Sequence, residues 1–308
     1  MNRFTARLGA KRIVVLDGGF ATEVESRGFP LTTALWSGQA VAERPDLVRA
    51  IHADYARSGA EILTAASYQL TIRGLVASGL DRKAADVLLE RAVGLARDAA
   101  REAAFPGSQP ALVAASIGSF GAYLTGGAEF HGRYDLAPDQ LAAHHRPQLE
   151  VLANTAPDVF ALETFARVDE AQIVCDLIGA LTTLPVWVAF CLRDGATIGD
   201  GTAVDDAIRR LAGHPAVAAI GFNCSSPAYV ARAVERARTL TTLPIVAYPN
   251  SGETYAGGRW LAAPRDGPPI LEVHRSLLAS GAAIVGGCCR TTPSDIGALA
   301  RLVESSRG

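Results

Sequence analysis

The sequence lacks several features that would assign the protein to a nucleic-acid-binding or membrane class. It has no basic cluster, and its 29 Lys and Arg residues are offset by 31 Asp and Glu residues to a net charge of −2. Nothing therefore indicates nucleic acid as a partner. No uninterrupted apolar stretch reaches the roughly 18 residues that a membrane span needs. Residues 1–11 carry charges but no apolar block, so we expect no signal peptide there.

Cysteine is scarce, and signs of internal division are missing. Five cysteines in 308 residues, an odd number without the pattern of a small secreted framework, favour a reducing compartment. We therefore expect a cytoplasmic protein. No linker, low-complexity tract or repeat of about 20–50 residues interrupts the chain. With 49% hydrophobic residues it can bury a large core, and residues 1–308 are expected to form one domain.

What the sequence does contain is a regular alternation of short apolar runs and helical patterns. The expected strands are residues 13–16, 62–65, 112–115, 159–162, 186–190, 217–222, 244–248 and 283–285. The expected helices cover residues 45–58, 81–104, a segment opened by Pro138, and residues 168–181, 204–211, 228–240, 269–280 and 293–304. Eight apolar strands, each followed by a helix, predict an α/β fold of the (β/α)₈ TIM barrel type. An open doubly wound sheet is the alternative, but its fingerprint G-x-G-x-x-G is absent from the first turn.

Two of the apolar runs end in cysteine. Residues 283–285 lead into Gly286-Gly287-Cys288-Cys289, and residues 217–222 are followed closely by Cys224. Adjacent residues of a strand face opposite ways, so the paired sulfurs can serve one site only where the backbone turns, as the two glycines permit. In a barrel both strand ends meet at one mouth, where three thiols predict a zinc site with an open fourth position. The alternative is that each cysteine is a small buried core residue.

Four other polar or aromatic residues fall at the same strand ends, where barrel enzymes carry their chemistry: Asp17, Tyr68, Glu163 and Asn250. Glu163 follows an apolar run, and burying an unpaired charge is costly, so we expect it to bind a substrate ammonium. A salt bridge to a neighbouring loop is the alternative. Asp17 precedes two glycines, so an ordinary turn residue is an equally good interpretation of it as a substrate-binding residue. Tyr68 fits rim packing, and Asn250 fits a turn after Pro249.

The remaining cysteines and the histidines do not extend the proposed metal site. Cys175 lies within a helical apolar pattern and is expected to pack in the core. Cys191 ends the fifth expected strand but has no partner among the other three cysteines. His144 and His145 are adjacent on a helix and do not face one another, and His52 lies in mid-helix. None of these histidines is expected to bind metal.

Together these residues resemble the homocysteine S-methyltransferase family over the whole chain, from Asp17-Gly18-Gly19 to Gly287-Cys288-Cys289. The resemblance is closest to the branch that uses S-methylmethionine. The segments carrying it are Leu35-Trp36-Ser37, Ala66-Ser67-Tyr68-Gln69, Gly121-Ala122-Tyr123-Leu124, His145-Arg146-Pro147, Tyr248-Pro249-Asn250-Ser251-Gly252-Glu253 and Gly287-Cys288-Cys289-Arg290-Thr291-Thr292-Pro293. The resemblance implies a methyltransferase of the EC 2.1.1 type, with Zn²⁺ held by Cys224, Cys288 and Cys289 and with Glu163 near the homocysteine amine. Ala65 departs from the family pattern, where threonine often stands, so one hydroxyl contact to the substrate is expected to be missing.

The expected reaction explains the need for a zinc site, because the acceptor thiol must be deprotonated before it can attack. A free thiol has a pKa near 8.5, whereas a thiol bound to zinc is deprotonated at neutral pH and can attack a methyl group. The donor is expected to be a sulfonium, either S-methylmethionine or S-adenosylmethionine, and its cation would be attracted to aromatic faces such as those of Trp36 and Tyr68. Core packing is the alternative for Trp36. The loop 120–134, rich in glycine and aromatic residues, is expected to form a lid, with a flexible surface insertion as its alternative.

Several other functions stay open on the sequence alone. A betaine donor makes similar demands on an aromatic pocket, and a selenol such as selenocysteine could replace homocysteine as the acceptor. A non-catalytic zinc-binding barrel would need a fourth protein ligand, and a redox protein would use Cys288 and Cys289 as a vicinal disulfide. A corrinoid-dependent enzyme is disfavoured, because the chain has no Asp-x-His-x-x-Gly motif and no second domain. In each enzyme reading the partners are small molecules only.

Overall fold

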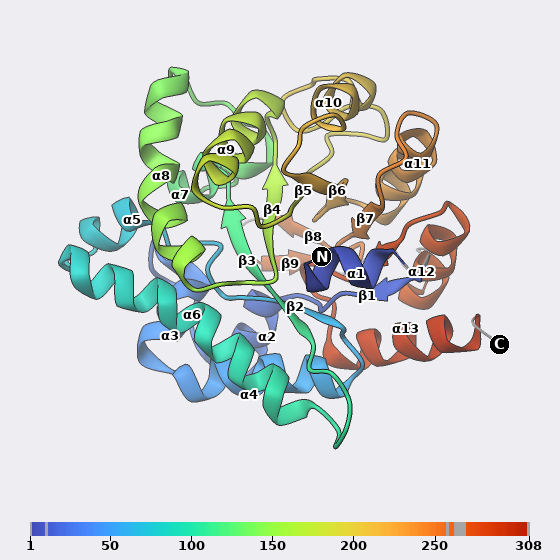
Figure 1. The fold of residues 1–308 in the computed structure, drawn as a ribbon, viewed down its shortest axis with the longest axis horizontal. Helices are drawn as coiled ribbons and strands as arrows, with labels where there is room; N and C mark the ends of the chain where they lie inside the picture. Colours follow the sequence, from blue (N-terminus) through green and yellow to red (C-terminus); the bar gives the residue numbers. More distant parts are fainter. Residues whose placement is uncertain (1, 10–11, 257–258, 262–268, 307–308) are drawn as a thin grey trace.

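The computed structural model describes residues 2–9, 12–256, 259–261 and 269–306. Its central element is a ring of eight parallel strands (Figure 1). The strands are β1 (Val14–Val15), β2 (Ile62–Thr64), β3 (Leu112–Gly118), β4 (Val159–Phe165), β5 (Val186–Phe190), β6 (Val217–Asn223), β7 (Ile245–Tyr248) and β10 (Ile284–Val285). They pair in the order β1-β10-β7-β6-β5-β4-β3-β2. A parallel bridge between Leu16 and Ile62 joins the two ends, so the ring is closed and the predicted (β/α)₈ barrel is confirmed.

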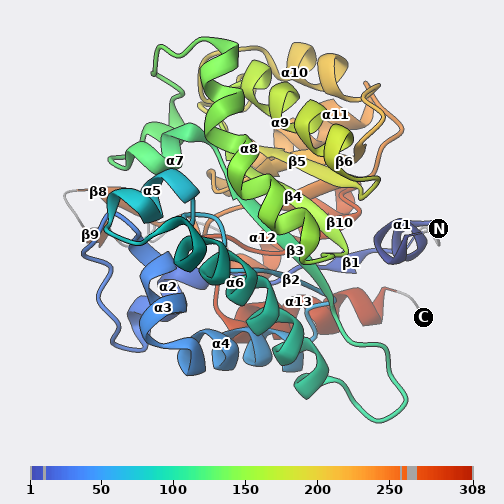
Figure 2. The ribbon, with the colours of Figure 1, turned by 60° about the vertical axis from the view of Figure 1, so that its left-hand side comes forward.

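Most of the described helices surround the ring on its outer side, and α1 (Arg3–Leu8) and α7 (Phe120–Leu124) lie at its two ends (Figures 1 and 2). The others are α2 (Phe20–Ser26), α3 (Gln39–Glu43), α4 (Pro45–Arg57), α5 (Ile72–Ala77), α6 (Arg82–Ala103), α8 (Pro138–Asn154), α9 (Val168–Leu181), α10 (Val204–Leu211), α11 (Pro227–Arg238), α12 (Ile270–Ala279) and α13 (Pro293–Ser305). Two short 3₁₀ turns, η1 (Trp36–Gly38) and η2 (Ala128–Phe130), and a hairpin of β8 (Thr254–Ala256) and β9 (Arg259–Leu261) complete the described elements. No helix in these residues combines the length and hydrophobicity of a membrane span.

Ordinary capping chemistry sets the helix boundaries that the sequence predicted. The Asp81 side chain accepts a hydrogen bond from the Ala84 amide at the start of α6. At the start of α13, Thr292 and Asp295 form a reciprocal capping box around Pro293. All eight predicted helices are found, with boundaries shifted by a few residues. The sequence analysis missed the shorter elements α1, α2, α3, α5 and α7 and the β8–β9 hairpin.

The core has two parts, as the alternation of side chains in a closed sheet requires. One part fills the space between the strands and the outer helices, and the other fills the barrel interior. The interior contains Trp187, Tyr248 and small residues such as Ala114 and Ala161. Phe4 of α1 belongs to this interior group and packs against Trp187 with ring centroids 5.9 Å apart. Helix α1 therefore closes the end of the barrel at which the strands begin.

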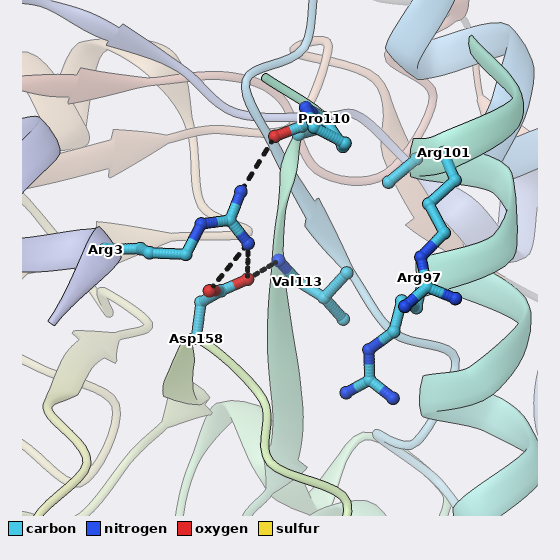
Figure 3. Close-up of a pocket in the computed structure, with 8 residues that line it drawn as sticks. Arg3, Arg97, Arg101, Pro110, Val113 and Asp158 are labelled. Carbon is cyan, nitrogen blue, oxygen red and sulfur yellow. Dashed lines mark hydrogen bonds and ion pairs between the residues drawn. The ribbon is translucent and has the colours of Figure 1, made fainter. Parts of the chain in front are cut away.

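The same end of the barrel has a small cavity of about 140 Å³ (Figure 3). Arg3 of α1 contacts the Asp158 carboxylate at 3.1 Å and donates to the Pro110 carbonyl at 3.2 Å. Asp158 in turn accepts a hydrogen bond from the Val113 amide at 2.8 Å. These contacts attach α1 to the beginnings of β3 and β4. In Figure 2, α1 lies at one end of the barrel, and α7 and the β8–β9 hairpin lie at the other.

Candidate metal centre and active site

Three of the five cysteines meet at the end of the barrel where the strands finish. Cys224 directly follows β6, and Cys288 and Cys289 follow β10. Their sulfur atoms all lie within 4.8 Å of one another, and the Cys224 and Cys289 sulfurs are 3.5 Å apart. Within the described residues this is the only group of His, Cys, Asp or Glu side chains with metal-binding spacing. The two strand ends therefore converge as the barrel prediction required.

Backbone hydrogen bonds hold the loops that carry these cysteines. The Cys224 amide donates to the Tyr248 carbonyl at 3.1 Å, and the Cys288 amide donates to the Pro249 carbonyl at 2.8 Å. The segment after β7 thus lies between the other two and bonds to both. Cys224 itself has a φ of 44°, a left-handed conformation that costs a non-glycine residue about 1–3 kcal/mol. Such strain is typical of a residue whose side-chain direction matters.

The glycines before the paired cysteines serve a different purpose from the one expected. Neither Gly286 nor Gly287 has a positive φ, so neither is needed for an unusual turn. A Cβ atom on Gly286 would instead lie 2.7 Å from the Asp17 carbonyl oxygen. One on Gly19 would lie 2.5 Å from the Cys288 carbonyl oxygen. The Asp-Gly-Gly and Gly-Gly-Cys-Cys segments therefore interlock at a distance that only glycine allows.

The three thiols suit a divalent cation. The hydrogen bonds that Cys224 donates to Cys288 and Cys289 raise its pKa, whereas accepting hydrogen bonds from its two neighbours holds the pKa of Cys289 well below its usual value. Without a cation the cluster therefore shares protons between its sulfurs. Ligands at about 2.3 Å from a tetrahedral zinc lie about 3.8 Å apart, close to the observed spacing. Thiolate sulfur is also a donor type that favours zinc over hard cations such as Mg²⁺ and Ca²⁺.

Glu163 lies in β4, at the mouth side of the barrel interior. The Ser116 hydroxyl donates to it, and the Tyr248 hydroxyl also stabilises its charged form. Trp187 Nε1 donates to the Tyr248 oxygen at 3.2 Å, so the carboxylate ends a chain of polar groups inside the barrel. Burial outweighs these bonds and raises the pKa of Glu163 to about 7. No ion pair to Glu163 is found in the described part of the chain, which disfavours the salt-bridge alternative.

Asp17 is buried directly after β1 rather than exposed in a turn. Its carboxylate accepts hydrogen bonds from the Thr64 amide at 2.7 Å and the Thr64 hydroxyl at 2.9 Å. Burial nevertheless raises its pKa well above the usual value, and the nearby charge of Glu163 adds to this. Two carboxylates that resist ionisation thus lie within electrostatic reach of each other. A cation placed between them would favour the ionised form of both.

The positions of the other three predicted substrate-binding residues, Tyr68, Trp36 and Asn250, do not by themselves assign them a substrate contact. Tyr68 is half-buried, with its hydroxyl beside Thr164 and within reach of the charges of Glu163 and Cys224. Trp36 is half-buried in η1, and no ring contact to it is found among the described residues. Asn250 accepts a hydrogen bond from the Gly252 amide at 3.0 Å, so its side chain forms the turn given as the alternative.

The residues expected to stay outside the metal site do so. Cys175 is fully buried in the core. Cys191 donates to the carbonyls of Glu129 and Phe165 and is not part of the cluster. The His145 ring contacts Glu170 at 2.8 Å with both side chains fully buried, and His52 stacks on Phe20.

Three functional candidates escaped the sequence analysis. Glu170 accepts hydrogen bonds from the Phe120 amide and the Tyr134 hydroxyl, so it holds both ends of the loop 120–134. Asn223, at the end of β6, bonds to Thr164 of β4. Glu129 lies in η2, within that loop. None of the three has a recognisable sequence signal without the fold. Glu170 lies in the first turn of an expected helix, Asn223 precedes a cysteine, and Glu129 lies in a glycine-rich loop.

Fold and site together define a class: a (β/α)₈ barrel enzyme with a three-thiol metal centre at the carboxyl ends of its strands. Comparison with known proteins narrows this class. The family model described as Homocysteine S-methyltransferase matches residues 14–303. The chain is 40% identical to Homocysteine S-methyltransferase of Escherichia coli (strain K12), over 97% of both chains. It is 37% identical to Homocysteine S-methyltransferase 4 of Zea mays, over 95% of this chain and 90% of that protein. The chain therefore belongs to the homocysteine S-methyltransferase family.

The solved structures agree with this assignment. The metallated form of the homocysteine methyltransferase MmuM from Escherichia coli superimposes with a TM-score of 0.86 at 38% identity. The match covers 96% of this chain and 98% of that one. Its oxidised form gives a TM-score of 0.85. The cluster of three cysteines and the metallated relative together support zinc as the metal of this centre.

Proposed function

We propose that this protein transfers a methyl group from S-methylmethionine to the thiol of homocysteine. The carbon–sulfur bond of the sulfonium breaks and leaves its electron pair on the donor sulfur, while the acceptor sulfur forms the new bond and its proton is released. Both products are methionine. The observation that carries the proposal is the group of three sulfurs within 4.8 Å at the barrel mouth, beside the carboxylate of Glu163.

We assign Cys224, Cys288 and Cys289 as the ligands of Zn²⁺. A zinc ion held by these three sulfurs would lower the pKa of the acceptor thiol, which would then be available as a thiolate at neutral pH. The chain contributes the fixed positions of the three sulfurs, which the loops after β6, β7 and β10 hold through backbone hydrogen bonds. No fourth protein ligand lies near them in the described residues, which favours a catalytic site over a purely structural one.

We assign Glu163 and Asp17 to the ammonium of homocysteine. Burial raises the pKa of both carboxyl groups, so a cation between them restores the charged form that burial disfavours. This arrangement orients the acceptor by its amino end while its thiol points to the cysteines. Tyr68 is assigned to the donor side, where its aromatic face suits a sulfonium. Trp36 and Asn250 stay as proposed substrate contacts at the rim.

The remaining sequence-based predictions are also part of the proposal. We propose that residues 1–308 form one homocysteine-binding barrel domain, supported by the family match over residues 14–303. We further propose that the protein works in the cytoplasm, because its five cysteines do not form the pattern of a small secreted framework. We also propose that it acts on small molecules alone, without nucleic acid or membrane, because its charges are balanced at a net −2 and its sequence has no basic cluster or long apolar run. Betaine as donor and a selenol as acceptor are tested below as rivals.

The test is methionine formation from homocysteine, without added cobalamin or folate, across S-methylmethionine, S-adenosylmethionine and betaine. Zinc content is measured in the same samples, and selenocysteine is offered as a second acceptor. We expect activity with S-methylmethionine, and expect Cys224→Ala, Cys288→Ala and Cys289→Ala each to lose both turnover and zinc. Cys175→Ala is the matched control and should keep its zinc. Full activity after chelation would refute the zinc-dependent mechanism. Activity with betaine alone would show that S-methylmethionine is not the methyl donor.

A further inference from the structure

Glu129 belongs to a tightly held part of the loop 120–134. It lies in η2, and its backbone carbonyl accepts a hydrogen bond from the Cys191 sulfur, 3.3 Å away, at the end of β5. A Cβ atom on Gly121 would lie 2.5 Å from the Glu129 amide nitrogen. One on Gly199 would lie 2.5 Å from the Phe130 carbonyl oxygen. The backbone of this turn therefore packs closely against Gly121 and Gly199, so the residue that carries the carboxylate has a defined position.

This carboxylate has an oxygen without a partner. Glu129 Oε2 is buried and has no hydrogen-bond donor, and no Arg, Lys or His forms an ion pair with Glu129 among the described residues. The other buried carboxylates at this end of the barrel are satisfied: Asp17 by Thr64 and Glu163 by Ser116. Burying a carboxylate oxygen without a donor or a cation is costly. The missing partner is therefore a group that the protein itself does not supply.

The electrostatic neighbours of Glu129 lie in the active site. After burial, the charge of Glu129 is the largest cause of the raised pKa of the Tyr68 hydroxyl. The charge of the Cys289 sulfur in turn raises the pKa of Glu129. The carboxylate is thus within reach of both the proposed donor pocket and the sulfur cluster. Because the side chain is half-buried, part of it is still open to a ligand.

We propose that Glu129 binds the α-ammonium of the methyl donor. The inference rests on the proposed function, because a reaction between two amino acids brings two ammonium groups into one mouth. Asp17 and Glu163 serve the acceptor, and Glu129 is the carboxylate left for the donor. It makes the enzyme specific for donors that are amino acids, and it positions the methyl group for an in-line attack.

The sulfonium of the same donor is the less suitable partner for Glu129. During transfer the sulfonium loses its positive charge, so a carboxylate against it would stabilise the substrate more than the transition state and slow the reaction. The ammonium keeps its charge throughout. Binding it lowers the KM for the donor without raising the barrier, and this predicts a change in KM rather than in kcat when Glu129 is neutralised.

The test compares Glu129→Gln with Asp135→Asn, which removes an exposed carboxylate near the same loop. For Glu129→Gln we expect the KM for S-methylmethionine to rise about 30-fold or more. The kcat, the KM for homocysteine and the zinc content should change little, and Asp135→Asn should match the wild type throughout. A donor KM within twofold of wild type, or a rise in the homocysteine KM instead, overturns the inference.

A second measurement does not depend on the variant's folding. The wild-type enzyme is offered 4-dimethylsulfoniobutanoate, which is S-methylmethionine without its amino group, as a donor and as a competitive inhibitor. We expect it to bind about 30-fold or more weaker than S-methylmethionine, and expect the penalty to shrink in Glu129→Gln. Equal binding of both compounds to the wild type overturns the inference. Failure of the proposed function is distinct, because the wild type would then form no methionine from S-methylmethionine at all.

Discussion

Asn223 of β6 and Thr164 of β4 are joined by two hydrogen bonds past the intervening strand β5, at the mouth of the barrel. The Asn223 side-chain oxygen accepts from the Thr164 amide at 2.9 Å, and its nitrogen donates to the Thr164 hydroxyl at 2.8 Å. Thr164 has a φ of 56° and Cys224, next to Asn223, has a φ of 44°. The pair therefore fixes two left-handed residues, one beside Glu163 and the other in the metal centre. It couples the proposed acceptor site to the proposed metal site.

The first prediction concerns this pair. Asn223→Ala leaves the buried Thr164 amide without an acceptor, which should destabilise the fold by about 1–3 kcal/mol. It should also weaken zinc binding, because Cys224 then loses a neighbour that fixes its backbone. Urea unfolding and zinc titration with a competing chelator measure the two effects. The control is Asn154→Ala, which removes an exposed amide that bonds within α8. Unchanged zinc affinity in Asn223→Ala would show that the pair is not needed for the metal centre.

The second prediction is a pH dependence that arises from Glu163. Burial places its pKa at about 7, above the usual value, so the carboxyl group is protonated below that pH and charged above it. Only the charged form attracts an ammonium. The KM for homocysteine should therefore fall as the pH rises through about 7, measured with saturating donor between pH 5.5 and about 8.5.

Neutralising Glu163 tests the origin of that dependence. Glu163→Gln keeps a hydrogen-bond acceptor for Ser116 but removes the charge, so the KM for homocysteine should rise about 30-fold or more with little change in zinc content. Its remaining pH dependence should reflect the acceptor thiol and Asp17, whose pKa is also raised by burial. Glu150→Gln, an exposed change on α8, is the control. An unaltered pH profile in Glu163→Gln would assign the titration to another group.

The sequence was sufficient for the barrel and the cysteine cluster, and the reasons are physical. Apolar strands of a closed parallel sheet are buried on both faces, so residues 159–162 and 217–222 stand out as continuous runs. The carboxyl ends of such strands must meet, which brings Cys224 to Cys288 and Cys289 without any other information. The chemistry of three thiols already predicted zinc, and the family resemblance added the substrate, which no spacing of residues could supply.

The rest of the site depends on contacts that have no sequence period. Gly286 is required by the close approach of the segment after β1, a relation between residues about 270 positions apart, and Gly287 by the close approach of the Thr291 side chain. Asn223 and Glu170 act through hydrogen bonds to Thr164 and Phe120, and these partners are set only by the three-dimensional fold. Helix α1 was missed because six residues carry too little pattern, although its Phe4 is fully buried.

The third prediction concerns Glu170, which holds the loop 120–134 at both ends. Glu170→Ala leaves the Phe120 amide, the Tyr134 hydroxyl and His145 without their acceptor, and should destabilise the protein by about 3–5 kcal/mol. Tyr134→Phe removes one of these bonds and should cost about 0.5–1.5 kcal/mol. Urea unfolding ranks the variants, and limited proteolysis locates any cleavage. Cleavage outside residues 119–134 would contradict the role of Glu170 in fixing this loop.

The fourth prediction separates two contributions of α1. Phe4 is fully buried beside Trp187, so Phe4→Ala should destabilise the protein by about 3–5 kcal/mol through lost burial and a new cavity. Arg3→Ala removes a partly exposed ion pair to Asp158 and should cost at most about 1 kcal/mol (Figure 3). Both variants should keep their zinc, because α1 lies at the opposite end of the barrel from the cysteines. Urea unfolding of the two variants side by side gives the comparison. If Arg3→Ala proved the more damaging change, the ion pair rather than the aromatic contact would be what attaches α1 to the barrel.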